Sequence, residues 1–489
     1  MVRAPARIRA AGYGRGPTAL LLITSTLCTC LILWWSYEVK MRCGGAPFTD
    51  GGRSLNMPGG DQDRLLPCYS DILQLWLGRG IDEHIFPYIH GGITADGTLF
   101  GGVVEYPVLS GLFMYLGAIG AHDDTEFFTH TALLLTPFAL VITVLLALLA
   151  RWRVLLWAAT PPLLLYAFHN WELPVTATTV AAIAVMAAGA RINPRTARRY
   201  LSLPTTAAIA AALLGVGFCL KLYPGIFVLP LALYVLHGGP GGYLRPSDGR
   251  RRLDWPGAGL VVGAATATVA LIQLPFMVAG FEGWRAALTF QSDRKADATT
   301  NSIWYWGVRY LTDDQSTYDT VVGVVSPILV LCAFAVAIAL GRRRAEQLGS
   351  YPWIGVAASM LAGFMLFHKV HSPQYTLWIL PFFVLLRIPW SLIAAYLIAD
   401  VVLDASVFRF LGFIDSGWPD GRAAVLVGVS SWIVAIVHLL LIPVFVAAPL
   451  AQPLRDIVSR GNSIDPGDGN GNDQDAPTPD RQTSTEGVG

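Results

Sequence analysis

The chain has few charged residues for its length. Its 34 Lys and Arg and 33 Asp and Glu make up 14% of 489 residues, whereas a soluble globular protein carries about 25%. At 54% apolar residues, a set of soluble domains would leave too much hydrophobic surface facing water. The composition therefore excludes an ordinary soluble protein and indicates a polytopic membrane protein.

Several common functional signals are also missing. The formal net charge is only +1, so there is no basic excess of the kind that nucleic-acid binding requires. The sequence has no P-loop, no GxGxxG opening a helix, no CxxC pair and no HExxH. These absences argue against nucleotide-driven transport and against a zinc protease.

Twelve apolar stretches are candidates for crossing a bilayer, which takes about 20 residues per helix. Several of them are short and contain Pro. They lie near 18–37, 127–150, 154–169, 173–190, 205–220, 223–238, 257–279, 320–341, 352–368, 374–388, 390–407 and 423–447. We expect an all-α polytopic membrane protein with about 12 transmembrane helices.

Basic clusters beside the spans set the expected orientation, because Lys and Arg concentrate on the cytoplasmic side. These clusters are Arg3 to Arg15, Arg151 with Arg153, Arg191 to Arg199, Arg250 to Arg252 and Arg342 to Arg344. An even number of crossings must then separate Arg15 from Arg151. The stretch 105–120 is short and begins with Glu and Pro, so we predict an interfacial helix there, and one long external segment over 38–126.

The same reasoning divides the chain into three parts. We expect a cytoplasmic N-terminal tail over 1–17, a transmembrane catalytic domain over 18–450 and a disordered cytoplasmic tail over 451–489, which is rich in Gly, Asp, Pro and Thr. The first span has no small-x-small cleavage site, so we interpret it as an anchor; a cleaved signal peptide is the alternative.

The six cysteines fall into two groups. Four lie within predicted spans, where they are interpreted as small packing residues: Cys28, Cys30, Cys219 and Cys332. Cys43 and Cys68 both lie in the external segment, an oxidising compartment, where a disulfide between them would add on the order of 3 kcal/mol of stability. The sequence leaves open whether that bond forms.

Ionisable residues near a membrane are candidates for function, because each costs free energy at low dielectric. On the predicted topology they gather on the external side, in YSDI, GIDEH, VEYPV, HNWELP, KLYP, FQSDRKAD and FHKVHSPQY. A few acids among several cations would suit an anionic substrate and a proton-abstracting carboxylate together.

The order CYSDI, PY and VEYPVLSG, HNWELP, KLYP and FHKVHSPQYTLWILP resembles the actinobacterial GT-C glycosyltransferases of family 87, which use polyprenyl-phosphate sugars. The resemblance covers roughly residues 15–450 and includes mannosyltransferases. It implies a GT-C fold, a catalytic Asp in the first external loop and surface helices after it. This chain departs from many members in having His371 before SPQY and Asp297 after FQSDR, so the sugar and the acceptor stay open.

The resemblance gives Asp71 the role of general base in an inverting transfer, in which one carboxylate suffices. The alternative is that Asp71 caps or opens its own short helix, begun near Ser70, where an acid is favoured in any case. Glu105 is a further candidate, with capping of the surface helix as its alternative. Asn170 and Glu172 are interpreted as partners of backbone groups at a turn.

The leaving lipid phosphate would need cations and hydrogen-bond donors. Candidates for its clamp are Lys369, Arg294 and Lys221, and the alternative for Lys221 is snorkelling to the interface. Four more residues are expected to hold sugar or phosphate oxygens or to be plain interface residues: His371, Gln374, Tyr375 and His368.

The leading hypothesis is a plasma-membrane glycosyltransferase that moves a sugar, expected to be mannose, from a polyprenyl-phosphate donor to an envelope glycolipid or polysaccharide on the outer face. No cofactor is expected, and the lone Asp of YSDI argues against a bound divalent ion. The rival classes are a transporter or flippase of a lipid-linked sugar, which often shows two related halves, and a non-catalytic scaffold.

Overall fold

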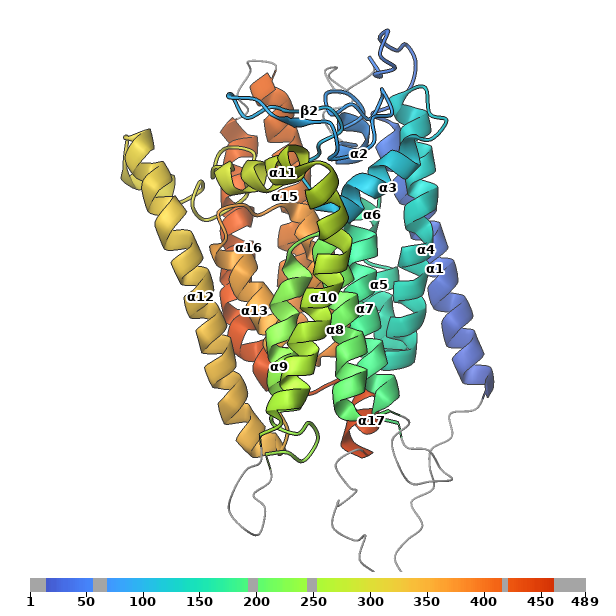
Figure 1. Ribbon diagram of the computed structural model, residues 1–489, viewed down its shortest axis with the longest axis vertical. Helices are drawn as coiled ribbons and strands as arrows, with labels where there is room; N and C mark the ends of the chain where they lie inside the picture. The colour runs from blue at the N-terminus through green and yellow to red at the C-terminus, as the bar shows by residue number, and fades with distance from the viewer. Residues whose placement is uncertain (1–14, 56–67, 192–200, 244–252, 416–420, 461–489) are drawn as a thin grey trace, which may run out of the picture.

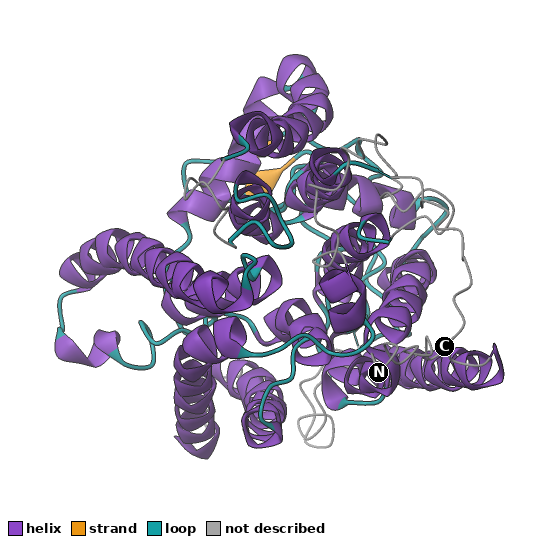
Figure 2. Cartoon of the chain, turned by 90° about the horizontal axis from the view of Figure 1, so that it is seen from below, coloured by secondary structure: helices purple, strands orange, loops and turns teal. Residues whose placement is uncertain are grey.

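The computed structural model describes residues 15–55, 68–191, 201–243, 253–415 and 421–460. These residues form a bundle of helices whose axes run broadly side by side (Figures 1 and 2). Strand structure in the described ranges is limited to an antiparallel pair, β1 (Gly92–Ile93) with β2 (Leu99–Phe100). The prediction of an all-α polytopic membrane protein is confirmed. The basic clusters at 192–199 and 250–252 and the tail beyond 460 lie outside the described residues.

Eight helices of the described chain are long and apolar enough to cross a membrane. They are α1 (Arg15–Met41), α4 (Asp124–Ala150, which continues through η2, Arg151–Val154, and α5, Leu155–Ala158), α7 (Glu172–Gly189), α8 (Leu203–Leu220), α10 (Trp255–Ala279), α12 (Gln315–Leu348), α15 (Trp390–Asp415) and α16 (Gly421–Ala447). Each coincides with a predicted span.

Shorter elements account for the remaining predicted spans and for the connections. They are α2 (Asp71–Gln74), α3 (Val108–Ala118), α6 (Pro161–Tyr166), η3 (Tyr223–Phe227), α9 (Val228–Leu236), α11 (Phe281–Asp293), η4 (Val308–Leu311), α13 (Trp353–Phe367), η5 (Pro373–Tyr375), α14 (Thr376–Leu385) and α17 (Leu454–Arg460). The predicted count of about twelve spans is therefore not confirmed, because Pro residues break several stretches into short helices.

The helices begin and end where the sequence provides caps. Asp123 accepts hydrogen bonds from the amides of Thr125 and Glu126 at the start of α4, and Asp314 accepts one from the amide of Thr317 at the start of α12. Gly349 ends α12 with a left-handed φ of +68°, which glycine adopts without strain. These contacts satisfy backbone groups that would otherwise be unpaired at the helix ends.

The long helices differ in how far they are buried by protein. Helices α7 and α8 pack against each other, and α8 packs on α10, yet α10 and α12 expose most of their apolar side chains, including Leu271 and Val278. In a membrane those faces contact lipid, and exposing apolar side chains to lipid carries no free-energy penalty.

One end of the bundle, called the loop end below, carries α2, α3, α11 and the β1–β2 pair (Figure 1). Helix α3 packs against α4 and α8. Its 11 residues extend only about 16 Å at 1.5 Å per residue, too short to cross a bilayer. This length fits the short surface helix expected within residues 105–120.

A disulfide joins Cys43, just beyond α1, to Cys68, just before α2, across a sequence separation of 25. Both cysteines are buried. The bond ties the start of α2 to the end of the first long helix, which settles the question that the sequence left open.

Removing this disulfide should lower stability by on the order of 3 kcal/mol, because the unfolded chain regains the entropy of an open loop. The variant C43S/C68S is expected to melt several degrees below the parent in a thermal unfolding scan in detergent. The matched control C30S/C332S, which changes two exposed free cysteines, should melt with the parent. Equal melting of both variants would contradict a stabilising role.

Candidate functional site

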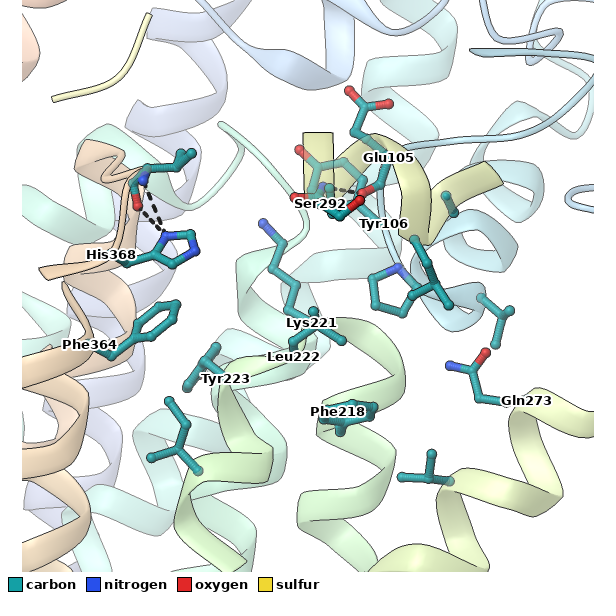
Figure 3. Close-up of a pocket in the computed structure, with 18 of the residues that line it drawn as sticks. Glu105, Tyr106, Phe218, Lys221, Leu222, Tyr223, Gln273, Ser292, Phe364 and His368 are labelled. Atoms are coloured by element: carbon teal, nitrogen blue, oxygen red, sulfur yellow. Dashed lines mark hydrogen bonds between the residues drawn. The ribbon is translucent and has the colours of Figure 1, made fainter. Parts of the chain in front are cut away.

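A cavity of about 750 Å³ lies below the loop end of the bundle. Figure 3 shows Lys221 projecting into it, with Phe364 and His368 on one side, Glu105 and Tyr106 on the other, and Phe218 and Gln273 below. The cavity draws its walls from segments far apart in sequence, from Tyr88 to Trp378.

The cavity has two chemically different parts. Its deeper wall is mostly apolar and comes from the long helices, with Phe218 of α8, Val269 of α10 and Phe334 of α12, and from the shorter helix α13, with Phe364. Its upper part holds the ionisable and polar side chains of Glu105, Tyr106, Lys221, Gln291 and His368. A ligand with a hydrophobic tail and a charged head would match both parts.

Lys221 is held by an ion pair inside the bundle. It follows the last residue of α8 and is only 7% exposed. Its Nζ donates to Glu172 Oε1, and Trp378 Nε1 donates to the other oxygen of Glu172. The ammonium also lies 4.6 Å from the ring centre of Tyr106, within cation–π range. The interpretation of Glu172 as a backbone partner is therefore wrong, and Lys221 points inward rather than snorkelling.

Aromatic rings form the wall next to this pair. The ring of Trp378 stacks on Tyr375 with centroids 3.8 Å apart and on Tyr223 at 4.2 Å. Stacked rings in a packed interior have little rotamer freedom. They therefore give the polar end of the cavity a rigid side.

Asp71 does not line the cavity and is connected to it through Asn170. It is the first residue of α2, and Ser70 serves as the cap, since its hydroxyl accepts from the amide of Ile72. The Asp71 carboxylate instead accepts a hydrogen bond from Asn170 Nδ2 at 2.6 Å. The same Nδ2 lies 2.6 Å from the hydroxyl oxygen of Tyr106, to which it also donates. Tyr106 lines the cavity, so Asn170 and Tyr106 connect the carboxylate to it.

Four consecutive residues, 68 to 71, are each anchored to a different partner. Cys68 is in the disulfide, and Lys40 Nζ donates to the carbonyl of Tyr69 at 2.8 Å. Ser70 Oγ donates to the carbonyl of Phe168 at 2.7 Å, and the amide of Asp71 donates to the carbonyl of His169 at 2.9 Å. These contacts fix the backbone that carries the carboxylate, whose side chain stays 21% exposed.

The neighbours of Asp71 are held in their neutral forms. Burial raises the pKa of Tyr69 and of Tyr106 well above the usual value, and the negative charge of Asp71 adds to the effect in both. Burial lowers the pKa of His169 well below its usual value, and the charges of Lys40 and Lys221 lower it further. His169 Nε2 lies 3.9 Å from Asp71 Oδ2. A carboxylate among neutral groups that carry hydrogen-bonding atoms can accept a proton from a substrate hydroxyl.

The structure brings together only part of the set predicted from the sequence. Four of its residues line the cavity, namely Glu105, Lys221, His368 and Tyr375, and Asp71 is linked to it. His371 and Gln374 are buried outside its lining, and His371 lies 5.6 Å from His438 between ring centres.

The predicted cations near the cavity mouth differ in how they are bound. Lys369 Nζ donates to the carbonyl of Ser292 at 2.8 Å. The predicted acid Glu105 is paired with a different cation, Arg79, at 3.2 Å. Arg294 ends α11 and has no hydrogen-bond or ion-pair partner within the described ranges, although its charge acts on Tyr69 and His368. Arg294 is half-buried.

Sequence reasoning missed four residues that build the site, namely Tyr106, Asn170, Glu172 and Trp378. Three of these residues stand in motifs that the sequence does show, namely Asn170 and Glu172 in HNWELP and Tyr106 in VEYP. These motifs do not indicate which distant residue each side chain contacts. Within the described residues, no group of three or more His, Cys, Asp and Glu side chains is arranged to hold a metal ion.

Comparison with known families gives a match to part of the chain. The model for the family described as "Mannosyltransferase (PIG-M)" matches residues 179–402, from α7 into α15. No curated protein and no solved structure matches the chain. The match covers Lys221, Arg294 and the segment 368–375, and it begins after the N-terminal part that carries Asp71. It supports an enzyme of the membrane glycosyltransferases, similar to mannosyltransferases of the GT-C type.

Proposed function

We propose that the protein transfers mannose from a polyprenyl-phosphate donor to an envelope glycolipid or polysaccharide, with inversion and with Asp71 as the general base. The observation that carries this proposal is the connection from Asp71 through Asn170 and Tyr106 to the cavity, at hydrogen-bond distances of 2.6 Å. A carboxylate anchored beside a cavity that suits a lipid with a charged head is what such a transfer requires.

The two parts of the cavity support the choice of donor. A polyprenyl chain is apolar and would lie against Phe218 and Phe334 of two membrane-spanning helices and against Phe364 of the shorter apolar helix α13. The phosphate and the sugar would then reach the polar end, where Lys221 and His368 lie. A soluble nucleotide sugar has no hydrophobic chain, so contact with the apolar wall would add nothing to its binding free energy.

Asp71 is suited to remove the proton from the acceptor hydroxyl. The hydroxyl attacks the anomeric carbon from the side opposite the phosphate, and the bond to the phosphate oxygen breaks as the new glycosidic bond forms. The proton passes to Asp71, and the electron pair leaves with the lipid phosphate. Because the side chain is partly exposed, an acceptor can approach it from the loop end of the bundle.

Arg294 is the strongest candidate for the phosphate, because it alone among the three proposed cations has no partner within the described part of the chain. A guanidinium can hold two phosphate oxygens at once. Lys221 is neutralised by Glu172, so we assign it to the floor of the phosphate site. Lys369 is bound to a carbonyl and would assist from the rim, with His371 and Gln374 acting from behind Tyr375.

The proposed orientation places Asp71 on the outer face of the plasma membrane, with both termini in the cytoplasm. Arg151 and Arg153, beyond α4, and Arg342 to Arg344, near the end of α12, belong to the end of the bundle opposite the loop end (Figure 1). Such arginine clusters mark the cytoplasmic side.

Replacing the base should abolish most of the activity. Asp71→Asn keeps the shape of the side chain but cannot take up the proton, so transfer from polyprenyl-phosphate mannose in isolated membranes should fall about 10²- to 10⁴-fold. Glu83→Gln, an exposed acid of the same segment, serves as the control and should transfer at the parental rate. Full activity of folded Asp71→Asn would rule out this mechanism.

Replacing Arg294 should slow departure of the phosphate. Arg294→Ala would lose a charge-assisted hydrogen bond of about 1.5–3 kcal/mol, which corresponds to a decrease of roughly 10- to 100-fold in kcat/KM. Arg294→Lys should recover part of this loss, because an ammonium keeps the positive charge but lacks the two parallel N–H donors of a guanidinium. Arg285→Ala, which changes an exposed Arg of the same helix, should have no effect. The proposal fails if Arg294→Ala and Arg285→Ala have the same kinetics.

The pH dependence of donor binding should show no contribution from His371. Burial, and secondarily the charge of His368, lowers the pKa of His371 to about 4, so the imidazole is charged only below that pH and neutral throughout the range 5.5 to 8. KM for polyprenyl-phosphate mannose should therefore have the same pH profile in the parent and in His371→Asn. A rise in KM near pH 6.5 that disappears in the variant would show a charged imidazole on the phosphate instead.

A further inference from the structure

The side-chain amide of Asn170 has a fixed orientation. Asn170 is fully buried, and its Oδ1 accepts a hydrogen bond from the backbone amide of Trp171 at 2.6 Å. Its Nδ2 donates one hydrogen to Asp71 Oδ2 and one to the hydroxyl oxygen of Tyr106, both at 2.6 Å. An amide NH₂ group only donates hydrogen bonds. Both hydrogens of Asn170 are therefore used, and the Tyr106 oxygen is the acceptor in their contact.

The Tyr106 hydroxyl keeps a hydrogen of its own. Because its oxygen accepts from Asn170, its O–H donates elsewhere, and the described residues include no acceptor for it. Burial raises the pKa of Tyr106 well above its usual value, and the negative charges of Asp71 and Glu105 raise it further, so the phenol stays protonated. Tyr106 is half-buried and lines the cavity (Figure 3). Its O–H is thus a hydrogen-bond donor for a ligand.

Tyr106 is held firmly in this position. Its carbonyl accepts a hydrogen bond from the hydroxyl of Tyr88 at 2.8 Å, and the carbonyl of the preceding Glu105 accepts one from Gln291 Nε2 of α11. The centre of its ring lies 4.6 Å from Lys221 Nζ. A side chain supported from several elements is already ordered before a ligand binds, which reduces the entropy lost on binding.

The two oxygens bound to Asn170 lie near each other. Asp71 Oδ2 and the Tyr106 hydroxyl oxygen are each 2.6 Å from Nδ2, so they are at most about 5.2 Å apart, twice that distance. An O–H···O hydrogen bond is about 2.7 Å long, so one ligand oxygen can reach both. In inverting glycosidases the groups that serve the attacking and the leaving oxygen are about 6.5–9.5 Å apart. Tyr106 is therefore too close to Asp71 to serve the leaving phosphate and belongs to the acceptor's side.

We propose that Tyr106 binds the acceptor by donating its phenolic hydrogen to the oxygen of the attacking hydroxyl, which in turn donates its own hydrogen to Asp71. This inference rests on the proposed function of Asp71. Asn170, Tyr106, the attacking hydroxyl and Asp71 then form a closed ring of hydrogen bonds in which each donated hydrogen has an acceptor. The ring uses one lone pair of the attacking oxygen and leaves the other free to attack the anomeric carbon.

Tyr106 keeps its hydrogen throughout the transfer. The attacking oxygen bonds to the anomeric carbon, its O–H bond breaks, and the proton passes to Asp71. The bond from the anomeric carbon to the phosphate oxygen breaks, and its electron pair leaves with the lipid phosphate. An alcohol oxygen has two lone pairs, whereas an amine nitrogen has one, which it needs for the attack. The arrangement therefore selects a hydroxyl acceptor and rejects an amine.

The test uses the full-length chain purified in detergent, with polyprenyl-phosphate mannose as the donor and a detergent extract of the native cell envelope, added at graded amounts, as the acceptor. Tyr106→Phe keeps the ring and removes only the O–H. It should raise KM for the extract about 3- to 10-fold, as expected for one neutral hydrogen bond, and change KM for the donor less than about twofold. KM does not depend on the fraction of folded protein, so partial misfolding cannot produce this result.

Tyr115→Phe is the matched control, because it removes a phenolic hydroxyl from helix α3 that does not line the cavity. It should have the parental KM for both substrates. A parental KM for the extract in Tyr106→Phe, as a purely structural role predicts, would overturn the inference. A rise confined to KM for the donor would also overturn it, because Tyr106 would then contact the phosphate. The proposed base fails separately, if Asp71→Asn transfers at the full rate, and that result is independent of the KM values in Tyr106→Phe.

Discussion

The site depends on the anchoring of residues 68 to 71. Helix α2 has only four residues, and an isolated helix of one turn has no stability of its own in water. Its start is held by a disulfide, an ammonium, a hydroxyl and a backbone amide, one for each residue. Two of the four anchors lead to the turn at 168–169 and two to the end of α1. The carboxylate of Asp71 is thereby held with the precision that its proposed role as a base would need.

Two buried ammonium groups lie next to this segment. Lys221 pairs with Glu172 on the cavity side, and Lys40 donates a hydrogen bond to the carbonyl of Tyr69. Burying a pair gives little net stability, because desolvation offsets the attraction. What these contacts fix is geometry: Lys221 is held near the ring of Tyr106, and Lys40 at the carbonyl of Tyr69.

Local features of this architecture were predictable from sequence, and distant contacts were not. Apolar runs located the eight long helices, and Ser70 before an amphipathic stretch located the start of α2. The partners of Asn170 are 99 and 64 residues away, and Trp378 contacts Glu172 across 206 residues. The spacing of apolar and polar residues along the chain does not show which distant side chains are in contact. Glu172 was therefore wrongly interpreted as a partner of backbone groups at a turn. His371 and Gln374, expected to hold sugar or phosphate oxygens, are buried outside the lining of the cavity.

The family match and the anchored segment contribute different halves of the site. Residues 179–402 include most of the apolar wall and the cations Lys221 and Arg294, which are the groups that a lipid phosphate would contact. Asp71, Tyr106 and Asn170 precede that range. The proposed reaction centre thus lies where the two halves meet, at the Asn170 amide that donates to both Asp71 and Tyr106. A donor-binding half can keep its chemistry while the preceding segment changes, so the acceptor would be selected chiefly by residues 68–126, which carry Asp71 and Tyr106.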